Sequence, residues 1–145
     1  MLAFVARKDS DEFYVLDLCD ELIGEPGSRQ HMFDWLLGDP SPKTGRSRRL
    51  PVDAYWPNIK LVVEYRERQH YETVGHFDKP DRLTVSGVHR GIQRRLYDER
   101  REHEIPLHGL RLVIIKASDL HASPNGRLKR SVDNDRAAIA QFLDI

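Results

Sequence analysis

The chain has 145 residues, of which 39% are hydrophobic and 32% charged, a balance typical of one soluble globular domain. Its 23 basic and 23 acidic residues cancel, so any phosphate contact must come from local basic runs rather than from a global positive field. The single cysteine excludes an intrachain disulfide, and the seven histidines show no zinc-ligand spacing. Without a membrane-length apolar run or a signal peptide, we expect a cytoplasmic protein with no membrane partner.

The first elements expected in chain order are two helices. Residues 10–23, SDEFYVLDLCDELI, begin with Ser10 as a helix cap and continue with acids in the first turn. The sequence GEPG at 24–27 ends this helix. A second helix is predicted over 28–37, with Ser28 as its cap. Its apolar residues would face the core: Met32, Phe33, Leu36 and Leu37.

The next elements alternate between loops, strands and helices. Residues 38–48 have the composition of a loop, and residues 50–70 are typical of a hairpin. A helix is predicted over about 86–104, and the apolar run at 110–116 predicts a central strand covered on both faces. A terminal amphipathic helix begins after Ser131. The helix at 86–104 would bury a stripe formed by Val88, Ile92 and Leu96.

This order of elements predicts one α/β domain spanning residues 1–145. We expect a three-layer sandwich in which helices flank a small mixed sheet. The helical part would cover residues 1–27, the core 28–120, and a loop with the last helix 121–145.

The hairpin LPVDAYWPNIKLVVEYRERQH carries an acid in the middle of each strand. A turn centred between residues 58 and 59 places Asp53 opposite Glu64. The same register places Val52 opposite Tyr65, and strand alternation puts Arg66 on the face of Glu64. Opposed carboxylates repel, so something must offset their charge. A divalent cation would do so, and so would a salt bridge to arginine; the spacing alone leaves both open.

The two hairpin acids and the ending EYRERQH resemble the PD-(D/E)XK nuclease superfamily. The segment LVVEYRERQH, followed by YDERR and HGLRLVIIK, is similar to the branch of very-short-patch repair endonucleases. The similarity covers roughly residues 25–118 and implies a restriction-endonuclease-like fold. It also implies a Mg²⁺- or Mn²⁺-dependent nuclease that hydrolyses DNA in repair, restriction or mobile-element defence.

The resemblance also implies roles for individual residues. Asp53 and Glu64 would bind the metal together with the carbonyl of Tyr65. Arg66 takes the place of the family's lysine, and it can support a phosphate although it cannot act as a base. Gln69 would assist catalysis. A preceding helix often adds an acid in this family, and Glu25 is favoured over Glu21 and Asp34.

Further basic residues, before, at the end of and after the hairpin, could contact the DNA backbone. The alternative is a loop and a helix face that are merely solvated. A homodimer would extend the binding face or supply a second cut. The residues expected to bind nucleic acid are Arg46, Arg48, Arg49, Arg90, Arg94 and His70.

Two rival interpretations remain at this stage. One is a non-catalytic nucleic-acid or protein binding module of the same fold, motivated by Arg66. The other is an unrelated α/β domain whose hairpin acids are neutralised by arginines.

Overall fold

A computed structural model describes residues 9–67 and 83–145. Two short 3-10 turns, η1 (Pro57–Ile59) and η3 (Ala117–Asp119), follow β2 and β4. The longer elements in chain order are α1 (Asp11–Ile23), β1 (Ser28–Leu37), β2 (Arg49–Trp56), β3 (Leu61–Arg66), α2 (Arg90–Leu107), β4 (Arg111–Lys116) and α3 (Val132–Leu143).

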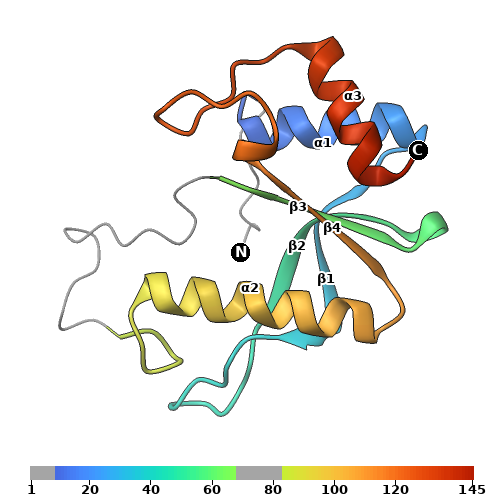
Figure 1. The fold of residues 1–145 in the computed structure, drawn as a ribbon. Coiled ribbons are helices and arrows are strands. Elements are labelled where there is room, and N and C mark those ends of the chain that lie inside the picture. The colour runs from blue at the N-terminus through green and yellow to red at the C-terminus, as the bar shows by residue number, and fades with distance from the viewer. Residues whose placement is uncertain (1–8, 68–82) are drawn as a thin grey trace.

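The four strands form one mixed sheet in the order β1-β2-β3-β4. β1 pairs with β2, and β2 with β3, in antiparallel fashion, whereas β3 and β4 are parallel. α1 and α3 lie over one face of the sheet, and α2 crosses the other (Figure 1). The prediction of an α/β domain with helices flanking a small mixed sheet is confirmed.

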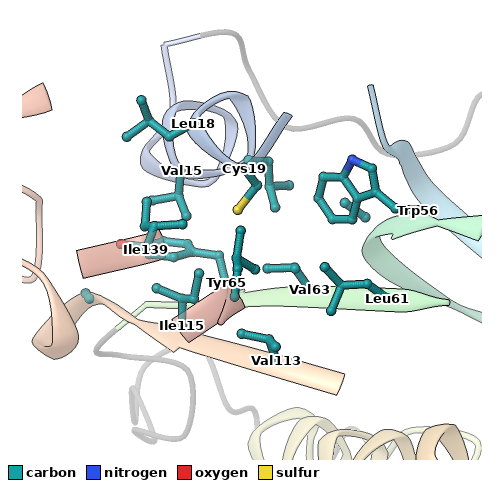
Figure 2. Close-up of a cluster of buried hydrophobic side chains, with 14 residues drawn as sticks. Val15, Leu18, Cys19, Trp56, Leu61, Val63, Tyr65, Val113, Ile115 and Ile139 are labelled. Atoms are coloured by element: carbon teal, nitrogen blue, oxygen red, sulfur yellow. The ribbon is translucent and has the colours of Figure 1, made fainter. Parts of the chain in front are cut away.

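Two apolar clusters hold the layers together. Figure 2 shows the larger one, between the sheet and the helices α1 and α3, where Val15 and Cys19 point at Val63 and Tyr65. Cys19 is fully buried and packs there as a small apolar side chain. The smaller cluster lies between the sheet and α2, and consists of Leu36, Leu50, Val52, Val62 and Ile105.

Local sequence signals located the first helix and the hairpin correctly. The hydroxyl of Ser10 accepts a hydrogen bond of 3.1 Å from the Phe13 N–H, which caps α1. The hairpin pairs Ala54 with Val63 and Trp56 with Leu61, which is the predicted register.

The prediction of a helix over 28–37 is wrong, because these residues form β1. Pairs of apolar residues at 32–33 and 36–37 fit one side of a helix, but they equally fit a strand with both faces partly covered. The period-2 signal was present in the rings of His31, Phe33 and Trp35, which lie one after another along β1. Pairing with β2 decides between the two periods.

Two further expectations need correction. β4 was predicted to be central but lies at the end of the sheet order, where Val113 and Ile115 are still buried by helices. α2 begins at Arg90, and its predicted stripe is not buried, since Ile92 is 48% and Leu96 38% exposed. The helix turns Asp98 and Ile105 inward instead, because a buried polar network occupies its inner face.

The side-chain alternation of β2 reverses at Asp53. Val52 packs in the α2-side cluster, whereas Ala54 packs in the α1-side cluster, although a regular strand points residues two apart to the same face. This reversal corrects the expected Val52–Tyr65 contact, because Tyr65 belongs to the α1-side cluster.

The neighbouring strand reverses at the same level. Arg29, the partner of Ala54, bonds to Asp20 of α1, whereas His31, the partner of Val52, contacts the ring of Tyr55 on the α2 side. Between them Gln30 has a φ of 49°, in the left-handed region. Along one line through Gln30 and Asp53, the side chains of β1 and β2 therefore switch from one face of the sheet to the other.

Within the described residues, no helix is both long enough and apolar enough to cross a lipid bilayer.

We expect Gln30→Val to lower the free energy of unfolding by about 1–2 kcal/mol, because a β-branched residue is strained at positive φ. Met32→Val, on an exposed position of the same strand that pairs with Pro51, serves as the control and should change stability by less than about 0.5 kcal/mol. Urea unfolding measures both. Equal effects would mean that the backbone at residue 30 is ordinary strand.

Candidate active site

The two hairpin carboxylates bond to each other's strand rather than only facing each other. The Asp53 N–H donates to Glu64 Oε2 at 2.7 Å, and the Tyr65 N–H donates to Asp53 Oδ2 at 2.8 Å. These bonds lie where the described β2–β3 ladder has ended at Ala54 and Val63. The two acids thus accept hydrogen bonds from the N–H groups of Asp53 and Tyr65, which have no carbonyl partner on the facing strand because the strands reverse here.

A third acid, Glu12, reaches this pair from the first turn of α1. It lies close enough to the pair for both acids to act on its pKa, which Asp53 lowers and the charge of Glu64 raises. Burial and the charge of Glu64 raise the pKa of Glu12 above its ordinary value. Sequence reasoning missed this residue, because an acid after a helix cap is already explained by the helix dipole.

Burial dominates the electrostatics of the pair itself. Desolvation, followed by the charge of Glu12, raises the pKa of Asp53 to about 7. Desolvation, followed by the charge of Asp53, raises the pKa of Glu64 to about 8. The cluster therefore holds protons at pH values where exposed carboxyls have lost them.

Arg101 of α2 approaches the acids from the opposite side of the sheet to Glu12. Its Nε lies 3.6 Å from Glu64 Oε1 and donates to the Pro51 carbonyl at 3.0 Å. One guanidinium nitrogen also donates to Asp98 Oδ1 at 3.0 Å. This cation lowers the pKa of Glu64 against the effect of burial, and it fixes the strand just before Asp53.

Arg66 lies on the α2 side, as Glu64 does, which agrees with the predicted alternation. It is almost completely buried and donates to Glu102 at 2.9 Å, with Asp98 at 3.9 Å. Arg66 is therefore engaged with acids of α2.

The other predicted acids lie elsewhere. Glu25 accepts a hydrogen bond from Asn58 at the hairpin turn, Glu21 pairs with Arg136, and Asp34 pairs with Arg49. The structure therefore brings Glu12 to the pair and leaves Glu25 at the far end of the hairpin. Gln69 and His70 lie outside the described residues.

The basic candidates divide between two places. Arg46, Arg48 and Arg49 line a groove beside the loop that joins β1 to β2. Arg90 and Arg94 are exposed along α2. The Tyr65 ring is buried in the α1-side cluster, and its backbone N–H bonds to Asp53.

The acids suit a hard divalent cation by their chemistry, since Mg²⁺ prefers carboxylate oxygens. Across residues 9–67 and 83–145, no group of three or more His, Cys, Asp or Glu side chains is arranged to hold a metal ion. Mg²⁺ usually takes one or two carboxylates and completes its shell with water and substrate phosphate. Asp53 and Glu64 fit that smaller requirement in their donor type.

No protein-family model matches the chain, and comparisons with curated proteins and with solved structures find no significant match.

The free energy of unfolding should fall as the pH rises from about 4 to 8 in the presence of EDTA. The folded state holds protons on Asp53 and Glu64 up to about pH 7 and 8, whereas the unfolded carboxyls lose them near pH 4. We expect a loss above about 1.4 kcal/mol, the equivalent of one pKa unit on one group.

The double variant Asp53→Asn, Glu64→Gln should flatten this dependence, because the amides keep hydrogen-bond acceptors but carry no charge. Asp34→Asn, which changes an exposed carboxylate, is the control and should follow the unmodified protein. Urea unfolding at a series of pH values measures all three. A double variant with the full pH dependence would show that the pair is not the cause.

Proposed function

We propose that this protein is a metal-dependent endonuclease that hydrolyses phosphodiester bonds in DNA. It would have a restriction-endonuclease-like fold of the PD-(D/E)XK type, with the very-short-patch repair branch as its nearest resemblance. The observation that carries the proposal is the buried pair Asp53 and Glu64 at the line where the sheet reverses, with Glu12 of α1 near enough to respond to both charges.

The electrostatics of the cluster favour cation binding. Three carboxyl groups share a desolvated site, and their mutual repulsion is part of what raises their pKa values. A divalent cation would remove this penalty by stabilising the charged forms. Arginine offsets only part of it, because Arg101 divides its contacts among Glu64, Asp98 and the Pro51 carbonyl.

When bound, Mg²⁺ would polarise a phosphate oxygen and lower the pKa of a water molecule. Asp53 and Glu64 would hold the cation, and Glu12 would add the helix acid that the family resemblance implies. Arg101, already beside Glu64, would support the charge that develops on the phosphate. Because arginine cannot accept a proton at neutral pH, proton transfer falls to a carboxyl group or to solvent, and the raised pKa values suit a carboxyl group.

A non-catalytic module of the same fold is the second candidate. Both hairpin carboxylates already accept backbone N–H groups, and Arg101 lies close to Glu64. Such a pair could exist only to satisfy the reversed strands. This candidate predicts a cluster that binds no divalent cation.

Supercoiled plasmid incubated with Mg²⁺ or Mn²⁺ should be nicked, and EDTA should prevent nicking. We expect Asp53→Asn, Glu64→Gln and Glu12→Gln each to lower the cleavage rate by more than about 100-fold. Loss of a residue that only hydrogen-bonds to a metal ligand lowers activity by about 10–100-fold, and loss of a ligand itself should cost more. Glu25→Gln, a matched change at the hairpin turn, should retain the rate. Gel densitometry over time measures the rates.

Metal binding is tested separately by thermal unfolding. At pH 8, Mg²⁺ at about 100 times its Kd should stabilise the protein by about 2.7 kcal/mol, and Asp53→Asn should abolish this gain. Stabilisation without cleavage of plasmid would point to a restricted substrate. If Mg²⁺ neither stabilises the protein nor supports cleavage, the protein is assigned to the non-catalytic module instead.

A further inference from the structure

A groove of about 1050 Å³ lies beside the loop that joins β1 to β2. Small-molecule pockets usually occupy roughly 300–1,000 Å³, so this groove is large for a single small ligand. One wall comes from the β1–β2 loop and the strand ends, and the other from the first turns of α2 and the residues before it. Figure 1 shows the loop on the side of the sheet that α2 crosses.

The groove combines an apolar lining with a basic rim. Met32 is 38% exposed and Val85 45% exposed, and both line it together with the buried Leu50. Arg46 and Arg48 stand exposed along the loop. An apolar surface beside exposed arginines suits a ligand with flat apolar groups on a polyanionic backbone.

The two loop arginines are available for a ligand. Among residues 9–67 and 83–145, neither Arg46 nor Arg48 has an acidic partner within ion-pair distance, whereas Arg49 pairs with Asp34 at 3.0 Å. The net charge of the chain is zero, so this local excess of positive charge is not part of a general basic surface.

The base of the loop is fixed to α2, which keeps the groove open. Arg100 donates to the Leu37 carbonyl at 3.0 Å and to Asp39 at 2.7 Å. The Tyr97 hydroxyl accepts a hydrogen bond from the Asp39 N–H at 3.0 Å. Gly38 permits this approach, since a Cβ there would lie 2.9 Å from the Tyr97 oxygen.

The groove reaches residues that neighbour the acid cluster. Pro51 and Gln30 line it, and they lie at or beside the line where the strands reverse. Arg101 connects the two sites directly, because it bonds to the Pro51 carbonyl and contacts Glu64. A chain lying in the groove would therefore pass beside Pro51, two residues before Asp53.

We propose that this groove binds a single-stranded segment of nucleic acid, with bases against Met32, Leu50 and Val85 and phosphates on Arg46 and Arg48. The inference rests on the proposed nuclease function, whose substrate it specifies as DNA with an unpaired strand beside the cleaved bond. Stacked bases of a duplex cannot reach an apolar groove, whereas unpaired bases can.

Fluorescence anisotropy with a labelled single-stranded oligonucleotide in EDTA tests binding without cleavage. We expect the single strand to bind more tightly than a duplex of the same length. Arg46→Ala, Arg48→Ala should weaken binding by about tenfold or more. The slope of log K against log salt should fall by roughly 1.4, because each phosphate that an arginine neutralises on a single strand adds about 0.7 to it.

Matched controls separate the groove from general charge effects. Arg127→Ala, Lys129→Ala removes the same charge from the exposed loop before α3 and should leave binding unchanged. Met32→Glu should weaken single-strand binding, whereas Ile59→Glu, at the exposed hairpin turn, should not. Thermal unfolding confirms that each variant is folded.

Tighter binding of duplex, or equal effects of the groove and control variants, would overturn the proposal. The result is independent of catalysis, because every measurement is made without metal. Single-strand binding in EDTA, combined with neither cleavage nor stabilisation when Mg²⁺ is added, would uphold the groove and reject the nuclease. Metal-dependent cleavage, combined with unchanged single-strand binding by the Arg46→Ala, Arg48→Ala variant, would uphold the nuclease and reject the groove.

Discussion

Two backbone amides, those of Asp53 and Tyr65, donate to carboxylates rather than to carbonyls, and the centre of the sheet depends on these bonds. A buried N–H without an acceptor would cost about 1–3 kcal/mol. The reversal at Gln30 and Asp53 creates this need, because the ladder between β2 and β3 is interrupted there. Acidic side chains meet it, and in doing so they are drawn out of water into the interior of the sandwich.

The acids consequently serve structure and chemistry with the same atoms. Replacing them by apolar residues would leave the amides unpaired, and keeping them charged requires compensation from Arg101 or a cation. α2 contributes that compensation through a polar inner face, in which Asp98 holds Arg101 and Glu102 holds Arg66. The polar face of α2 therefore packs toward the acids, and its apolar residues Ile92 and Leu96 are exposed to solvent.

The sequence predicts this fold best where the signals are local. The cap of α1 and the hairpin register follow from neighbouring residues, and the register alone placed Asp53 beside Glu64. The reversal could not be predicted, because glutamine has no preference for a positive φ and adopts one only under the constraint of pairing.

Long-range packing explains the remaining differences. Glu12 joins the acids because α1 packs over β3, and no spacing in the chain encodes that approach. The apolar run of β4 indicates burial on both faces but not a position within the sheet, so an edge strand covered by helices has the same pattern as a central one. The apolar pairs of β1 fit both a helix and a strand until β2 is present to pair with them.

The burial of Cys19 gives this chain a built-in reporter of its own opening. The side chain has no exposure between α1 and the sheet, and burial raises the pKa of its thiol to about 12. A thiolate is the species that reacts with alkylating reagents, so burial and the raised pKa slow this reaction in the folded protein. Because this is the single cysteine of the chain, the rate at which such a reagent modifies the protein measures how often α1 separates from the sheet.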